Sequence, residues 1–126
     1  MNVVDSSGWL EYFADGPNAD LFAEAVEDTE DLLVPAIVIF EVHKRILQQR
    51  GEAEALQKSV FMEQARVIAL DAALARNAAK MSCELKLPLA DSIILATARA
   101  HNATLWTQDQ DFKGIEGVKF YPARGS

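Results

Sequence analysis

Five acidic side chains, Asp5, Glu41, Asp91, Asp109 and Asp111, have the chemistry to hold a divalent metal ion if the fold brings them together. Carboxylate oxygens are hard ligands that suit Mg²⁺ or Mn²⁺, whereas zinc usually takes histidine or cysteine. Carboxylates packed together also raise one another's pKa and cost folding free energy unless a cation neutralises them. A magnesium or manganese site is therefore the chemistry that these acids offer.

Four of the acids have ordinary structural explanations when taken singly. Asp5 could cap a helix after a strand, and Asp91 could favour the positive end of a helix dipole. Asp109 and Asp111 could be turn residues. These explanations must hold independently of one another, whereas a single metal site accounts for all the positions.

Glu41 lies in an otherwise apolar stretch, Ile37–Val42, which predicts a largely covered helix. Its structural alternative is an exposed ion pair with Arg45, worth only roughly 0.3–0.5 kcal/mol. Glutamate is rarely buried without a partner, and a metal ion would be such a partner. We therefore favour a functional role for Glu41.

The elements that must position these acids alternate between strand and helix along the chain. Apolar runs predict strands at 1–4, 32–34, 104–107 and 118–121, with a short extended piece at 67–70. Helical patterns and caps predict a helix starting at 6–8 and containing 9–13, then helices at 19–27, 36–49, 52–65, 71–85 and 90–101. This alternation is typical of an α/β fold with a parallel sheet, in which ligands bind at the carboxyl ends of the strands. No linker or repeat divides the 126 residues, so we expect a single domain over 1–126.

Composition narrows the functional classes. The net charge of -7, from 19 acids and 12 bases, argues against nucleic-acid binding through a broad basic face, but not against a nuclease that engages phosphates through a metal. The only cysteine, Cys83, rules out an internal disulfide and is expected to be buried. His43 and His101 lack the spacing of a ligand pair and are expected to be surface or packing residues.

Two further absences bear on location. No apolar run approaches the roughly 20 residues needed to span a bilayer. Met1 is followed almost at once by a core strand, without the basic region that opens a signal peptide. We therefore expect no membrane association and a cytoplasmic location.

Four segments, in order along nearly the whole chain, resemble the motifs of the PIN-domain family, in particular the VapC-type ribonuclease toxins of bacterial toxin–antitoxin pairs. The first segment, Val3–Ser7, resembles the opening motif of two apolar residues, Asp, Ser or Thr, and Ser. The others are Pro35–Val42, with its acid on a helix, Leu87–Ala98, centred on Asp91, and Leu105–Phe112, which contains Thr-x-Asp-x-Asp-Phe. No single motif is specific, but the ordered set is.

The resemblance implies a fold and a role for each site residue. The fold would be a three-layer α/β sandwich, with a central parallel sheet of four to five strands flanked by helices. The metal-binding, catalytic acids would be Asp5, Glu41, Asp91 and Asp109. Asp111 would be an auxiliary acid, and Thr107 and Ser6 supporting hydroxyls; whether Asp109 or Asp111 lies closer to the metal stays open.

The implied activity is hydrolysis of RNA by an endoribonuclease that depends on Mg²⁺ or Mn²⁺ and forms the toxin component of a type II toxin–antitoxin pair. Metal-activated water would cleave the phosphodiester and leave a 5′-phosphate and a 3′-hydroxyl. A homodimer and a cognate antitoxin protein that blocks the site are also implied. Candidate RNA contacts on the helices around the cleft are Lys44, Arg45, Lys80 and Arg99, and a candidate dimer patch contains Leu21, Phe22, Val60 and Phe61.

Three other functions share some of these sequence features. An aspartate-nucleophile phosphatase needs a second Asp two residues after the first, where this chain has Ser7. A phosphorylatable receiver domain needs paired acids after its first strand, and Asp5 has no acidic neighbour. A PIN-like scaffold or binding module without nuclease activity is the remaining alternative, and the retention of all four acids speaks against it.

Overall fold

A computed structural model describes residues 1–125 and contains a sheet of five parallel strands. The strands lie in the order β3-β2-β1-β4-β5. Strands β2 and β3 therefore lie on one side of β1, and β4 and β5 lie on its other side. Their bounds are β1 Asn2–Val4, β2 Leu32–Pro35, β3 Arg66–Ile68, β4 Thr104–Thr107 and β5 Val118–Phe120. The predicted α/β class with a parallel sheet is confirmed.

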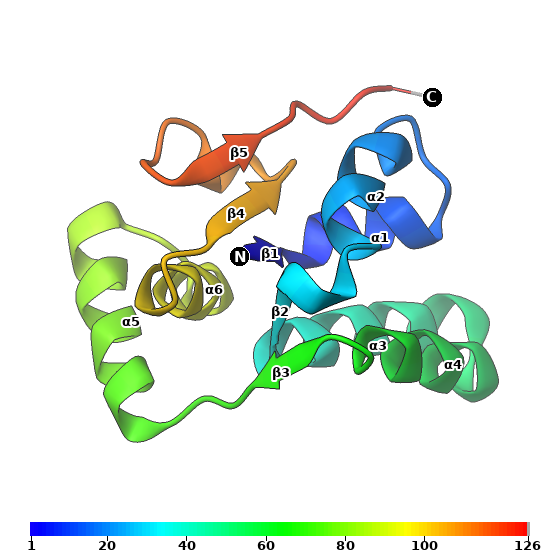
Figure 1. Cartoon of the computed structure of the whole chain (residues 1–126), viewed down its shortest axis with the longest axis horizontal. Coiled ribbons are helices and arrows are strands. Elements are labelled where there is room, and N and C mark those ends of the chain that lie inside the picture. The colour runs from blue at the N-terminus through cyan, green and yellow to red at the C-terminus, as the bar shows by residue number, and fades with distance from the viewer. Residues whose placement is uncertain (126) are drawn as a thin grey trace.

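Helices cover both faces of this sheet. Figure 1 shows α5 and α6 on one side, α1 and α2 on the other, and α3 and α4 as a helical hairpin beside β2 and β3. The bounds are α1 Ser6–Phe13, α2 Ala19–Val26, α3 Ala36–Arg50, α4 Glu52–Met62, α5 Ala72–Leu85 and α6 Leu89–Ala100. Two short 3₁₀ turns, η1 Thr29–Asp31 and η2 Gln110–Phe112, were not predicted.

The boundaries differ from prediction by a few residues at most. Pro35 ends β2 and is also the residue before α3, because its extended backbone (φ -60°, ψ 137°) suits both positions. Helix α4 ends at Met62, before the predicted end at Ala65, and the chain continues in a turn. β3 pairs only with β2 and so forms one edge of the sheet.

The core lies where α1, α2 and α6 pack on the central strands. Val3 and Val4 of β1 and Leu105 of β4 are fully buried. At Gly8, a Cβ atom would lie 2.6 Å from Cγ1 of Val4 and 2.9 Å from the ring of Phe22. Glycine is therefore required at this position, because only its missing side chain lets α1 begin so close to β1.

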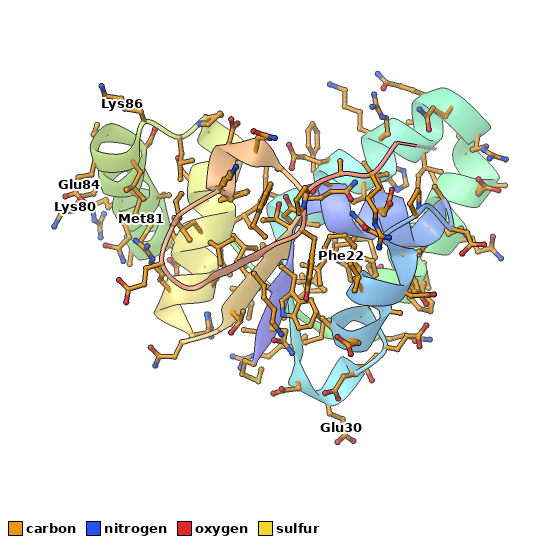
Figure 2. All side chains as sticks on the ribbon, turned by 90° about the horizontal axis from the view of Figure 1, so that it is seen from above. Phe22, Glu30, Lys80, Met81, Glu84 and Lys86 are labelled. Carbon is orange, nitrogen blue, oxygen red and sulfur yellow. The ribbon has the colours of Figure 1, made fainter. Side chains whose placement is uncertain are left out.

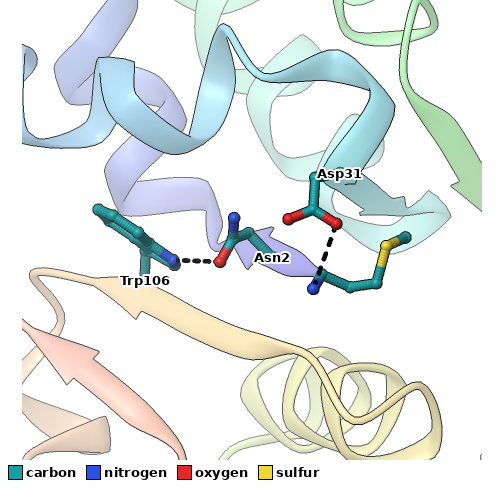
Figure 3. Close-up of polar contacts among 4 residues, drawn as sticks. Asn2, Asp31 and Trp106 are labelled. Atoms are coloured by element: carbon teal, nitrogen blue, oxygen red, sulfur yellow. Dashed lines mark hydrogen bonds and ion pairs between the residues drawn. The ribbon is translucent and has the colours of Figure 1, made fainter.

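Polar contacts fix β1 against its neighbours at the amino end of the sheet (Figure 3). The indole nitrogen of Trp106 donates to Oδ1 of Asn2 at 2.9 Å, next to the backbone pairing of β1 with β4. The amino group of Met1 lies 3.3 Å from a carboxylate oxygen of Asp31. These contacts help set the register that places the residue after β1 beside the residues after β4.

The structure corrects three expectations about burial. Helix α3 buries Val38, Val42 and Ile46 and partly buries Ile37 and Ile39, but Phe40 is 60% exposed. Phe22 is buried within the molecule rather than part of a surface patch (Figure 2). Its ring packs edge-on against Tyr121. Cys83 is exposed on α5 rather than buried.

Of the predicted dimer patch, Val60 is exposed, and Leu21 and Phe61 are only partly so. Among residues 1–125, no helix combines the length and the apolar character that a membrane crossing requires.

Candidate metal centre

The carboxyl ends of β1 and β4 lie side by side at the point where the strand order reverses. Val4 is in register with Trp106, and the backbone nitrogen of Asp5 donates to the carbonyl oxygen of Trp106 at 3.1 Å. In open parallel sheets this reversal leaves a crevice in which ligands bind. The side chains that follow the two strands, those of Asp5 and Thr107, therefore meet at the position where a site is expected.

Asp5 is held rigidly at this crevice. Its carboxylate caps α1 by accepting from the Gly8 nitrogen at 2.9 Å, and it also accepts from Ser7 Oγ at 2.8 Å and Thr107 Oγ1 at 2.6 Å. The side chain is only 2% exposed. Burial raises the pKa of Asp5 to about 6, although the three hydrogen bonds oppose the shift, and the charge of Asp109 raises it further.

Asp91, Asp109 and Asp111 form a triad in which one carboxylate oxygen from each lies within 4.8 Å of the others. Asp91 lies in the first turn of α6. Asp109 caps η2 by accepting from the Asp111 nitrogen at 2.9 Å. The Asp109 nitrogen in turn donates to Thr107 Oγ1 at 2.9 Å, so Thr107 links the triad to Asp5.

Burial and the other acids of this cluster raise the pKa of Asp91. Burial raises the pKa of Asp91 to about 7, with further contributions from the charge of Asp109, a hydrogen bond with Asp111, the charge of Asp111 and the charge of Asp5. Burial is the largest cause of this rise and the neighbouring carboxylates add to it, so a bound cation would offset part of the cost of ionising Asp91. The donor set is all hard oxygen, so the residues fit Mg²⁺ or Mn²⁺ rather than zinc.

Glu41 lies on α3, outside the triad. Its Oε1 accepts from Ser6 Oγ at 2.6 Å, and Ser6 directly follows Asp5 in the chain. The side chain is partly buried, and no ion pair joins it to Arg45 within residues 1–125. Its polar partner is thus a hydroxyl on the helix that Asp5 caps.

Two of the four candidate basic residues lie near Glu41. Lys44 and Arg45 line a groove of about 310 Å³ together with Ser6 and Glu41. Lys80 extends from the outer side of α5, 3.9 Å from Glu84 (Figure 2). Arg99 is at the far end of α6, where it donates to the Glu116 carbonyl at 3.3 Å. The structure does not bring Lys80 and Arg99 to the acids.

The two histidines contact other residues than the candidate acids. Nδ1 of His43 lies 3.1 Å from Ser59 Oγ, and Nδ1 of His101 lies 3.0 Å from the Thr97 carbonyl oxygen. Both rings are partly buried, in agreement with their predicted packing role.

Two residues that shape the site, Ser7 and Asn18, were not among the predicted site residues. Ser7 donates to Asp5, as described above. Asn18, which is 1% exposed, donates from Nδ2 to Gln108 Oε1 and to the Pro122 carbonyl, both at 3.0 Å. Its Oδ1 accepts from Arg124 Nε at 2.6 Å. The Gly16-Pro17-Asn18 turn was readable from the sequence, but no local signal showed that Asn18 holds Gln108, the residue between Thr107 and Asp109.

Comparison with known proteins identifies the family. The profile of the PIN domain matches residues 3–118, which is most of the chain. The chain belongs to the PIN domain family. No curated protein matches this PIN domain.

Several solved structures share its fold. A chain in a toxin–antitoxin complex from Klebsiella pneumoniae is 25% identical to this PIN domain, with a TM-score of 0.81 over 97% of this chain and 99% of that chain. VapC20 of Mycobacterium tuberculosis, described as a sarcin-ricin loop cleaving toxin, is 17% identical, with a TM-score of 0.74 over 99% and 100% of the two chains. A chain of VapBC2 from Rickettsia felis, bound to promoter DNA, is 17% identical, with a TM-score of 0.72 over 96% and 97%. The predicted PIN-domain family is thereby confirmed, and the chain shares its fold with these VapC and VapBC chains.

Proposed function

We propose that this PIN domain is an endoribonuclease that depends on Mg²⁺ or Mn²⁺ and acts as the toxin of a type II toxin–antitoxin pair. The observation that carries the proposal is the cluster of Asp91, Asp109 and Asp111 beside the buried Asp5, in which the pKa values of Asp5 and Asp91 are raised to about 6 and about 7. A protein gains no stability from crowding acids in this way. The arrangement is explained by a cation that neutralises them.

The triad would hold the metal, with Asp5 and Glu41 completing the acidic surroundings. Asp111, which the motif suggested as an auxiliary acid, has an oxygen within 4.8 Å of oxygens of the other two acids, and we assign it to the ligand set with Asp91 and Asp109. When bound, the metal would lower the pKa of a water molecule and neutralise the negative charge of the phosphate.

The remaining residues would orient these groups. Thr107 fixes both the carboxylate of Asp5 and the backbone of Asp109, and Ser6 fixes the carboxylate of Glu41. Lys44 and Arg45, beside Glu41, would contact phosphates of the RNA. No protein nucleophile is required, because water would attack the phosphodiester.

RNA as substrate and an antitoxin as partner are supported by the solved structures. The similar chain from Klebsiella pneumoniae comes from a toxin–antitoxin complex, and VapC20 is described as cleaving the sarcin-ricin loop. We extend the toxin role, a homodimer and a cytoplasmic location to this chain as parts of the same proposal. Light scattering across micromolar concentrations tests the dimer, and a monomer throughout would contradict it.

The test of the activity is cleavage of labelled RNA by the purified protein with Mn²⁺. Asp5→Asn and Asp91→Asn should each lower the cleavage rate by at least about a hundredfold, while Asp20→Asn, an exposed acid on α2, should leave it unchanged. Wild-type rates in both site variants would contradict the proposal. Titration calorimetry with Mn²⁺ separates a scaffold from an enzyme, since a scaffold would bind no metal.

A further inference from the structure

We propose that the groove beside Glu41 is a nucleotide subsite, in which Phe40 stacks on a base of single-stranded RNA and Lys44 and Arg45 hold the adjoining phosphate. The groove encloses about 310 Å³ and is lined by Ser6, Leu10, Phe40, Glu41, Lys44, Arg45 and Gln48. The inference rests on the proposed ribonuclease function and adds a base-binding position to it.

Phe40 is the feature that calls for a ligand. Its side chain is 60% exposed, although the helix buries three other apolar residues on its opposite face. Every base has a flat π-face, so an exposed aromatic ring at a groove is the usual platform on which proteins bind single-stranded RNA. The partly buried Leu10 on α1 adds a second apolar surface to the same groove.

The cations of the groove favour a nucleic acid over an apolar ligand. Lys44 and Arg45 lie next to each other in the chain and are exposed in a protein whose net charge is -7. Lys44 Nζ lies 5.8 Å from the centroid of the Phe40 ring, so one cation and the aromatic surface are within a nucleotide's reach of each other. A phosphate bound by Lys44 would therefore carry its base toward Phe40.

Glu41 and Ser6 connect the subsite to the candidate metal centre. Both line the groove, they are hydrogen-bonded to each other at 2.6 Å, and Ser6 adjoins Asp5. An RNA strand that follows this surface would place one base on Phe40 while a neighbouring phosphate lies at the acidic crevice. The subsite would thus select for unpaired nucleotides beside the cleaved bond.

The experiment measures binding of fluorescein-labelled decauridine by anisotropy in a cleavage-deficient Asp91→Asn background. Phe40→Ala should weaken binding by at least about fivefold, in line with the loss of one stacked base, and Phe40→Trp should restore it. Leu56→Ala is the matched control, because Leu56 on α4 is also 60% exposed and does not line the groove. Thermal melts should be alike for all variants, since both side chains lie at the surface.

Decauridines with one abasic ribose at successive positions separate base stacking from charge. The affinity of the parent protein, which retains Phe40, should fall when the abasic ribose is at one particular position. The affinity of Phe40→Ala should not fall further with that oligonucleotide, because the substitution and the missing base remove the same contact. Equal affinities of Phe40→Ala and its parent, or equal losses in Leu56→Ala, would overturn the subsite. The subsite would also be contradicted if Phe40→Ala bound a protein partner more weakly but bound RNA with unchanged affinity.

Cleavage kinetics keep this inference distinct from the proposed function. In the otherwise wild-type protein, Phe40→Ala should raise KM for single-stranded RNA more than it lowers kcat. If Phe40→Ala cleaves RNA with an unchanged KM, the proposed subsite is contradicted but the proposed nuclease activity is not. If the protein cleaves no RNA but binds it in a Phe40-dependent way, the proposed nuclease activity is contradicted but the proposed subsite is not.

Discussion

Thr107 Oγ1 donates to Asp5 Oδ2 at 2.6 Å and so joins two side chains that are 102 residues apart in the chain. The same hydroxyl oxygen accepts from the Asp109 nitrogen, which ties the loop after β4 to the loop after β1. The geometry of the candidate metal centre depends on this one side chain.

Replacing Thr107 by valine should therefore damage the site without changing its shape. The variant keeps the volume but leaves the buried Asp5 carboxylate with one donor fewer and the Asp109 nitrogen without its partner, at a cost of about 1–3 kcal/mol in the free energy of unfolding. The pKa of Asp5 should rise above about 6, because the Thr107 hydrogen bond lowers it. Urea unfolding and the pH profile of cleavage measure these effects. Thr107→Ser retains the hydroxyl and should be close to the wild type in both stability and pH profile. If Thr107→Ser instead behaves like Thr107→Val, the hydrogen bond to Asp5 is not the cause of the changes.

The metal-free protein should lose stability as the pH rises from about 4 to about 8. The pKa values of Asp5 and Asp91 are raised to about 6 and about 7 in the folded state, so folding favours their protonated forms. Below the unfolded values near 4 both states are protonated, and above the folded values the full cost of two buried charges is present. Melting curves in EDTA across this range measure the slope, which should be smaller in Asp91→Asn. An equal slope in that variant would show that other groups carry the effect.

Mn²⁺ should reverse that loss. A metal that binds the ionised acids stabilises only the folded state, so its effect on Tm should be larger at pH 8 than at pH 5, where protons compete for the carboxylates. Melting curves at the two pH values with and without Mn²⁺ measure the difference. Asp91→Asn should show a much smaller shift, and Asp20→Asn the wild-type shift.

Asn18→Ala should lower the rate of RNA cleavage although Asn18 touches none of the acids. The substitution removes the Nδ2 group that donates to the partly buried Gln108 and to the Pro122 carbonyl, and each lost hydrogen bond should cost about 0.5–1.5 kcal/mol. Mn²⁺ affinity, measured by calorimetry, should fall because Asp109 follows Gln108. Arg124→Ala is the matched control, since it removes another partner of Asn18 but leaves the contact with Gln108. A drop in stability with unchanged Mn²⁺ affinity would confine Asn18 to a structural role.

Gly8→Ala should destabilise the protein by about 1–3 kcal/mol, because its Cβ would overlap Val4 and Phe22 and push α1 away from β1. Since Asp5 caps α1 through the Gly8 nitrogen, cleavage should fall together with stability. Gly125→Ala, which meets open space, is the control in urea unfolding. A Gly8→Ala protein as stable as the wild type would mean that the contact can relax without cost.

The sequence alone determined the order of elements and the family, because these depend on local patterns. Apolar runs marked the strands, caps and glycines marked most helix ends, and the ordered motifs pointed to Asp5, Glu41, Asp91 and Asp109 by their positions in the chain. Spacing along the chain is enough for such inferences, since hydrophobic periodicity and turn chemistry act over a few residues.

Only the tertiary structure decided which side chains meet. It placed Asp111 in the triad with Asp91 and Asp109, set Glu41 against Ser6, and left Lys80 and Arg99 away from the acids. It also exposed Phe40 and buried Phe22, two aromatic residues whose apolar neighbours look alike in sequence. The physical reason is that burial and convergence follow from strand order and helix packing, which join residues far apart in the chain and leave no periodic trace in it.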